Sequence, residues 1–271
     1  YITNPYFDYE LIYDIKPTGD NGFILAGADS ASWQFNETAV LQRSMGGFPW
    51  LVKTDSAGNI VWKKRHTGNA GVSSAFSSVV QARDGGFVAV GSLWKCCPAD
   101  TVFLIAKYSA AGNLLWEKQY GGTKGDGAFS ISNTATNGFI VTGYTKSTDG
   151  DVVGNNGTAG KSDVWLLRID DNGNIMWKKC FGGTGDEIGE SVVQTADYGF
   201  VVAGSATSAN GNLTNNIGGY DGWVFKTDSS GNFLWQRNAG SISNDAFRKI
   251  IVGVDNHIYV AGFADSTNQI I

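Results

Sequence analysis

Short apolar segments alternate with glycine-rich turns along all 271 residues of the chain. Five nearly continuous apolar segments have the form Gly-Phe-x-x-x-Gly or a close variant of it, and they lie at residues 22–27, 86–91, 138–143, 199–204 and 257–262. Segments of this length and composition predict strands that are buried on both faces. No window shows a sustained period of 3.6 residues, so we expect no substantial helix.

A second repeated feature is a turn that leads into a tryptophan. The four copies are TDSAGNIVW, YSAAGNLLW, IDDNGNIMW and TDSSGNFLW, ending at Trp62, Trp116, Trp177 and Trp235. We expect the turn glycine and the asparagine after it to supply the positive φ angles of a tight hairpin. The tryptophans are expected to be largely buried between neighbouring sheets, where a ring buries on the order of 150–250 Å².

The spacing of these turns predicts the architecture. The turn glycines, Gly58, Gly112, Gly173 and Gly231, are 54, 61 and 58 residues apart, which is the period of one propeller blade. Each unit offers four short strands in sequence, and repeated antiparallel meanders form propellers. The sequence thus predicts an all-β propeller of four-stranded antiparallel blades.

We expect one domain over residues 1–271, with about 4.5 blades visible. Their expected ranges are about 8–66, 71–122, 125–183 and 186–240, followed by an incomplete blade at 241–271. Two explanations of the incomplete blade stay open. The propeller is five-bladed and partly closed by residues 1–7, or the chain is a fragment of a larger propeller and of a longer polypeptide, which we favour because open sheet edges are avoided.

Composition narrows the classes of partner. The net charge is −5, and lysines and arginines are scattered singly, which argues against nucleic-acid binding. No run of about 18 apolar residues is present, so we expect no membrane insertion. The three cysteines have no metal-ligand spacing.

Long irregular loops are expected at one end of the blades, at about 28–48, 92–101, 144–163 and 205–221. Variable loops on a repeated scaffold often carry binding sites. The candidate ligand-binding residues are the aromatics of these loops, which could stack on sugar rings: Trp33, Phe35, Trp94, Tyr144 and Tyr220. Packing within the loops is the alternative role of these rings.

One of these loops also suggests a metal site. Oxygen-bearing side chains recur at Asp149, Asp151, Asn155 and Asp163, a spacing with which Ca²⁺ could be chelated. The matching loop carries amides at Asn210 and Asn212, and such residues are also common in tight turns. Calcium binding and a purely structural role therefore both stay open.

Acids recur at the start of the first strand of a blade as well, at Asp126, Glu187 and Asp245. We expect them to pair with loop amides or with the repeated third-strand cations, which are Lys53, Lys107, Arg168 and Lys226.

The unit from residue 126 to residue 186 resembles the secreted repeat propellers of Bacteroidota and some archaea, whose chains often end in a surface-sorting domain. It is more distantly similar to pyrroloquinoline-quinone-type propellers, which share the glycine turn and the docking tryptophan. The resemblance implies a secreted or cell-surface protein. The cofactor and metal residues of the quinone enzymes have no counterpart here, so no cofactor is expected beyond the calcium considered above.

These features favour a non-catalytic propeller that binds or adheres to a protein or a glycan through its long-loop face. A carbohydrate-binding, lectin-like propeller is the alternative. A glycosidase is less favoured, because it needs a pair of carboxylates and we find Asp14 as the one acid on the predicted inner strands. His66 and His257 lie at non-equivalent repeat positions, so we expect no enzyme activity.

Overall fold

The computed structural model describes residues 9–30, 47–67, 74–95, 101–158 and 160–265. Every regular element in these ranges is a β-strand, which confirms the all-β prediction. Trp33, Phe35, Cys96 and Cys97 lie outside the described residues. The chain divides into two compact units, residues 1–119 and 120–271.

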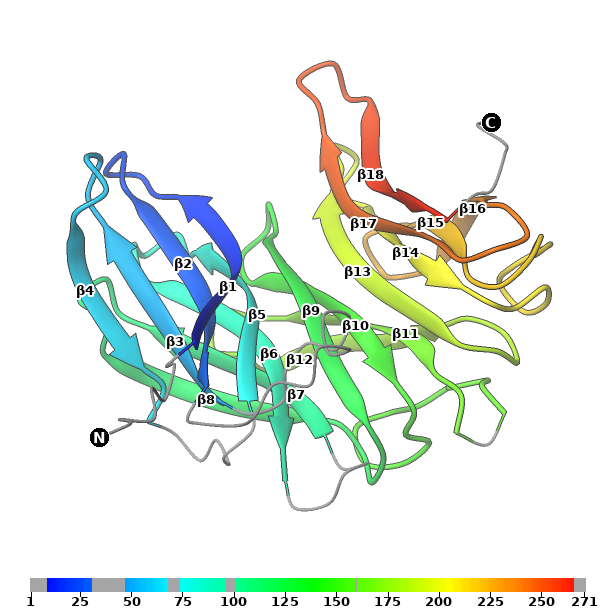
Figure 1. Cartoon of the computed structure of the whole chain (residues 1–271), viewed down its shortest axis with the longest axis horizontal. Coiled ribbons are helices and arrows are strands. Elements are labelled where there is room, and N and C mark those ends of the chain that lie inside the picture. The colour runs from blue at the N-terminus through cyan, green and yellow to red at the C-terminus, as the bar shows by residue number, and fades with distance from the viewer. Residues whose placement is uncertain (1–8, 31–46, 68–73, 96–100, 159, 266–271) are drawn as a thin grey trace, which may run out of the picture. The chain divides into compact units, whose positions relative to one another are not determined.

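The first unit holds two four-stranded sheets (Figure 1). The first sheet consists of β1 (Tyr9–Pro17), β2 (Phe23–Ser30), β3 (Gly47–Thr54) and β4 (Ile60–Arg65). The second consists of β5 (Ser74–Gln81), β6 (Phe87–Trp94), β7 (Thr101–Tyr108) and β8 (Leu114–Tyr120), and the boundary between the units falls at the end of β8.

The second unit holds two complete sheets and a two-stranded one. The complete sheets are β9 (Asp126–Asn133), β10 (Phe139–Thr145), β11 (Asp163–Ile169) and β12 (Ile175–Phe181), then β13 (Glu187–Gln194), β14 (Phe200–Ala206), β15 (Asp221–Thr227) and β16 (Phe233–Ala239). The last pair is β17 (Asp245–Val252) and β18 (Ile258–Ala264).

Each sheet is an antiparallel meander in chain order. The first strands of successive sheets are neighbours within each unit, since β1 contacts β5 and β13 contacts both β9 and β17. This is the arrangement of propeller blades, with the first strand innermost and the fourth outermost. The predicted β-propeller of four-stranded blades is confirmed, and the described residues form four complete blades and the first two strands of a fifth.

Every inner strand contains a β-bulge, which the sequence pattern did not reveal. The pairing register skips one residue in each inner strand: Tyr13, Ser77, Phe129, Glu190 and Arg248. Each bulge presses a carbonyl oxygen against the glycine of the neighbouring second strand. A Cβ on Gly204, for example, would lie 1.8 Å from the Ile188 oxygen. This close approach explains the glycine that ends each Gly-Phe-x-x-x-Gly segment.

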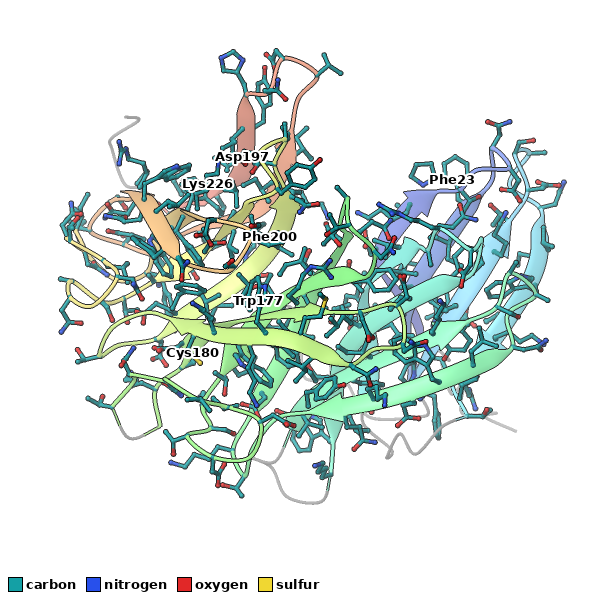
Figure 2. All side chains as sticks on the ribbon, turned by 180° about the vertical axis from the view of Figure 1, so that it is seen from behind. Phe23, Trp177, Cys180, Asp197, Phe200 and Lys226 are labelled. Atoms are coloured by element: carbon teal, nitrogen blue, oxygen red, sulfur yellow. The ribbon has the colours of Figure 1, made fainter. Side chains whose placement is uncertain are left out.

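Trp62 and Trp177 contact the next blade of their own unit, and all four repeated tryptophans are partly buried rather than fully enclosed. In the first unit the Trp62 indole nitrogen donates to the Ala110 oxygen of the next blade at 3.0 Å, and its ring covers Gly112. Trp177 donates to the Ser229 oxygen at 3.2 Å and meets Phe200 edge-on at 5.8 Å (Figure 2). The rings lie on the outermost strands, which leaves their other side open to water.

The hairpin turns between third and fourth strands differ from prediction in one detail. The four turn glycines do have positive φ angles, from 77° to 85°, but the following asparagines do not. Instead, in the three turns that begin with aspartate, the asparagine side chain donates to that aspartate, as Asn59 does to Asp55 at 2.9 Å. The asparagine therefore stabilises the turn by a side-chain hydrogen bond and not by its backbone conformation.

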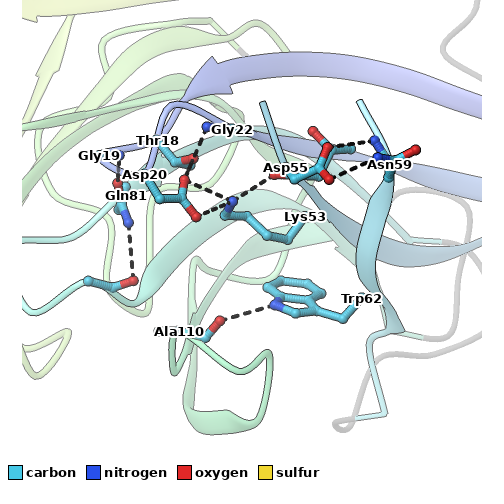
Figure 3. A network of polar contacts seen from close by, with 12 residues as sticks. Thr18, Gly19, Asp20, Gly22, Lys53, Asp55, Asn59, Trp62, Gln81 and Ala110 are labelled. Atoms are coloured by element: carbon cyan, nitrogen blue, oxygen red, sulfur yellow. Dashed lines mark hydrogen bonds and ion pairs between the residues drawn. The ribbon is translucent and has the colours of Figure 1, made fainter. Parts of the chain in front are cut away.

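Lys53, Lys107 and Arg168 are buried and Lys226 is partly buried, and these third-strand cations bind the turn between the first two strands of their own blade. Lys53 contacts Asp20 at 2.7 Å and donates to the Thr54 oxygen at 2.7 Å (Figure 3). The equivalent pairs are Lys107 with Asp84 and Lys226 with Asp197. In the third blade, which has no acid at the equivalent position, Arg168 instead donates to backbone oxygens, including that of Ile169 at 2.5 Å.

Candidate functional site on the long loops of the second unit

Two long loops of the second unit are held by the same hydrogen bonds. They connect β10 to β11 and β14 to β15, and each folds over the segment that enters its own blade. In the first loop, Asp149 Oδ1 accepts the Thr123 amide at 2.8 Å. In the second, Asn210 Oδ1 accepts the Thr184 amide at 2.9 Å. An aspartate and an asparagine thus perform one structural role.

A second contact repeats in the same way. Asp151 Oδ2 accepts the Gly121 amide at 3.3 Å, and Asn212 Oδ1 accepts the Gly182 amide at 3.0 Å. A neutral amide oxygen replaces a carboxylate at both positions. These positions therefore require a hydrogen-bond acceptor and do not require a negative charge.

The third repeated contact spans the loop. Asn155 donates through its side-chain nitrogen to the Thr145 oxygen at 3.2 Å, and Asn216 donates to the Ala206 oxygen at 3.2 Å. The carbonyl oxygen of the Asn155 side chain accepts the Gly157 amide at 2.9 Å. The backbones of both loops are therefore tied down along their length.

The structure shows what the four candidate calcium ligands contact. Asp149, Asp151 and Asn155 are engaged with backbone groups, and Asp163, the first residue of β11, is buried and accepts the Asn156 amide at 2.8 Å. Within the described ranges, no three acidic, histidine or cysteine side chains are grouped as metal ligands. Each of the four residues therefore has a hydrogen-bond partner within the protein, and calcium binding at this loop stays a prediction.

The acids at the start of the inner strands complete this network. Asp126 accepts the Gly122 amide at 2.8 Å and the Ser147 hydroxyl at 3.0 Å. Glu187 accepts the Gly183 amide at 2.8 Å. The expectation that these acids bind loop amides is confirmed, whereas pairing with the third-strand cations was wrong, because those cations bind turns elsewhere in the blade. Burial raises the pKa of Asp126 although its hydrogen bonds oppose the shift.

On this rigid framework, polar and aromatic side chains gather around Tyr220. Lys161 and Asp186 form an ion pair at 2.7 Å, and the lysine side chain is 48% exposed. Tyr220 is half-buried, and its pKa is raised by burial and by the Asp186 carboxylate, against the effect of Lys161. An aromatic ring, a cation and an anion are thus within electrostatic reach of one another.

Exposed apolar side chains lie on the same loops. Val153 is 67% exposed and Ile217 is 49% exposed, and Ile242, in the connection to β17, is 81% exposed. A Cβ on Gly218 would lie 2.4 Å from the Ile242 carbonyl carbon, so the second loop packs directly on this connection. These side chains and the group around Tyr220 together give the long-loop face of this unit its chemistry.

Three of the predicted ligand-binding aromatics, Trp94, Tyr144 and Tyr220, lie within the described residues. Trp94 is the half-buried last residue of β6, in the first unit. Tyr144 lies within β10 and not in a loop, where its ring contacts Phe129 at 5.6 Å. Tyr220 is the predicted aromatic that lies in a described long loop.

Sequence reasoning missed several residues of interest. The ion pair of Lys161 and Asp186 was not predicted, because nothing in the repeat marks these residues as a pair. Glu190 was also overlooked, so the statement that Asp14 is the one acid on the inner strands was wrong. Asp14 is engaged with Lys16 at 3.2 Å and with the Ser78 hydroxyl at 2.7 Å. Only the pairing of β13 with β14 shows that Glu190 is the bulged residue of an inner strand.

Comparison with known proteins supports the fold. No family model matches the chain. A protein of unknown function from Dyadobacter fermentans is similar in structure, with a TM-score of 0.59 and 11% identity over 96% of this chain and 76% of that one. A GH43 β-xylosidase/α-arabinofuranosidase from a compost microbial metagenome has a TM-score of 0.51 and 10% identity, covering 95% and 86% of the two chains.

One curated relative is similar in sequence. The regulatory protein FlaEY of Caulobacter vibrioides is 24% identical over 181 residues, which is 60% of this chain. The matched part spans 19% of that protein's length. These likenesses indicate the propeller fold and leave the function to be argued from the site. In the described part of the chain, no helix has the length and apolarity to cross a membrane.

Proposed function

We propose that this chain is a non-catalytic binding module of the cell exterior, which engages a protein or glycan through its long-loop face. The observation that carries the proposal is the shared hydrogen-bond set of the two loops. Asp149 and Asn210 fix the two loop backbones in the same way, while their exposed side chains differ. A rigid framework with variable side chains is the usual design of a binding surface.

The described acids support a binding role over a hydrolytic one. Asp14 is held by Lys16 and Ser78, and Glu190 is held by Arg248, so each of these two inner-strand carboxylates has a structural partner. A glycosidase requires two carboxylates positioned on either side of a sugar bond. The extracellular location is proposed from the resemblance to secreted repeat propellers.

A lectin-like function is the second candidate. It is favoured by the group around Tyr220, because an aromatic face beside Lys161 and Asp186 offers both stacking and hydrogen bonds to sugar hydroxyls.

The test compares the two ends of the blades. A glycan array and a surface-protein binding screen would identify a ligand, after which Tyr220→Ala and Lys161→Ala should weaken its binding about tenfold or more. Ser230→Ala and Ala111→Ser, in the opposite hairpin turns, serve as controls and should leave binding unchanged. Equal losses in both sets would contradict the loop-face assignment. Sugar hydrolysis by the wild-type chain would contradict the non-catalytic one.

A further inference from the structure

The inner-strand bulges recur at the same place in each blade, but the residue at the bulge differs between blades. Beside two of the three bulges in the second unit, a serine makes the same contact with the next blade: Ser130 Oγ accepts the Val192 amide and Ser191 Oγ accepts the Ile250 amide, both at 3.3 Å. The bulged residues themselves are a phenylalanine, a glutamate and an arginine. A β-bulge redirects its side chain, and such positions are frequent beside functional sites.

The three bulged residues of this unit contact one another or the second strands beside them. The Phe129 ring lies 5.6 Å from that of Tyr144, and the Arg248 guanidinium lies 5.3 Å from the Phe263 ring. Arg248 also pairs with Glu190. Tyr144 and Phe263 hold equivalent positions, since each directly follows the glycine that accommodates the bulge. We name these five residues the inner bulge patch.

Neighbouring strands bring the parts of the inner bulge patch together. A Cβ on Gly189 would lie 2.3 Å from Thr142 Oγ1, so the residue before Glu190 packs directly on the part of β10 that carries Tyr144. The strands β13 and β17 are likewise neighbours, as the ion pair between Glu190 and Arg248 requires. The patch therefore extends over three successive inner strands of one unit.

The chemistry of the patch suits an uncharged ligand with both apolar and polar faces. The Phe263 ring is 47% exposed, and Phe129 and Tyr144 are half-buried. The one anion and the one cation of the patch neutralise each other, with side-chain exposures of 5% for Glu190 and 52% for Arg248. Paired charges give little attraction for a polyanion, but the exposed guanidinium edge still offers directional donors.

A pyranose ring has this combination of an apolar C–H face and a rim of hydroxyl groups. We propose that the inner bulge patch binds a neutral saccharide, with the aromatic rings stacking on the sugar and Arg248 donating to its hydroxyls. This inference goes beyond the proposed loop-face function, because it names a second site on the inner strands together with its ligand class and residues.

Binding would be measured by titration calorimetry with neutral oligosaccharides selected from a glycan array, with uronic-acid oligosaccharides as the charged comparison. Phe263→Ala and Arg248→Gln should each weaken binding of the neutral ligand about tenfold or more. The matched controls are Leu234→Ala and Arg237→Gln, which make similar changes on the outer strand β16, where Leu234 is 52% exposed. These controls should leave binding unchanged.

Thermal unfolding of every variant separates lost binding from lost folding. If Phe263→Ala is unstable, Phe263→Leu keeps most of the volume and removes the aromatic face, so it should weaken binding in the same way. The inference is overturned if the wild type binds no neutral saccharide, binds only charged ones, or if Arg248→Gln behaves like Arg237→Gln. A ligand whose binding is lost only in Tyr220→Ala and Lys161→Ala would contradict this inference and would support the proposed loop-face function.

Discussion

Asp163 and Glu187 face each other across Gly182, with a carboxylate oxygen of each lying 2.4 Å from the place where a Cβ on that glycine would be. Both side chains are fully buried, and Oδ1 of Asp163 has no hydrogen-bond partner. Burial, and to a lesser degree the charge of Glu187, raise the pKa of Asp163 to about 7, against the opposing effect of its hydrogen bond from Asn156. Two buried like charges at this junction are unfavourable unless one is protonated.

This pair predicts a pH-dependent stability. Because the pKa of Asp163 is higher in the folded state than in the unfolded chain, folding takes up a proton, and stability should fall as pH rises from about 4 to 7. Asp163→Asn removes the charge and lets an amide donate toward Glu187. The variant should gain about 1–3 kcal/mol in unfolding free energy at pH 8 and lose much of the pH dependence.

Urea unfolding across this pH range provides the measurement. Asp265→Asn, at an exposed position after β18, is the control and should follow the wild type. An Asp163→Asn variant that is less stable than the wild type at pH 8 would show that the buried charge is compensated in a way that these contacts do not reveal.

The tryptophan contact between blades predicts a stability difference between adjacent residues. Trp177→Ala uncovers Gly231 and removes the hydrogen bond to Ser229, so it should cost about 2–4 kcal/mol. Met176→Ala, one residue earlier and 59% exposed, should change stability by less than about 0.5 kcal/mol. Equal midpoints of urea unfolding for the two variants would mean that the ring does not join the blades.

Tyr198 predicts a stabilising substitution. Its φ angle is 66°, whereas the equivalent turn positions hold Asn21, Gly85, Asn137 and Asn256, residue types that tolerate this conformation. Tyr198→Asn should raise the unfolding free energy by about 0.5–1 kcal/mol, because the backbone strain is relieved. Tyr198→Phe keeps the strain and should have no effect. A loss of stability in Tyr198→Asn would show that the half-exposed ring contributes more than the strain costs.

The inner-strand bulge predicts an intolerant glycine. Gly204→Ala would place a Cβ 1.8 Å from the Ile188 oxygen, so the bulge must shift, and we expect a loss of about 3 kcal/mol or more. Gly19→Ala, whose Cβ would meet nothing closer than 3.7 Å, should be nearly neutral. Thermal unfolding measures both, and a well-tolerated Gly204→Ala would mean that the bulge can relax without cost.

The candidate site was only partly predictable from the sequence. The composition of the loops identified Tyr220, and the alternation of aspartate and asparagine indicated that Asp149 and Asp151 have counterparts. The sequence could not distinguish a carboxylate that chelates a metal from one that accepts a backbone amide. The two differ only in which group, distant in the sequence, approaches the carboxylate. The Lys161–Asp186 pair is formed by residues 25 positions apart, so its formation depends on how two blades meet.

The sequence by itself determined the propeller, because the hydrophobic period, the turn residues and the repeat length are local properties that recur in each blade. Antiparallel meanders leave few other ways to bury such segments. The tertiary structure alone decided the bulges at Phe129, Glu190 and Arg248, the half-burial of the tryptophans and the buried pair of Asp163 and Glu187. These features arise where strands of different blades approach, and the energies of close approach, desolvation and charge depend on contacts between residues far apart in the chain.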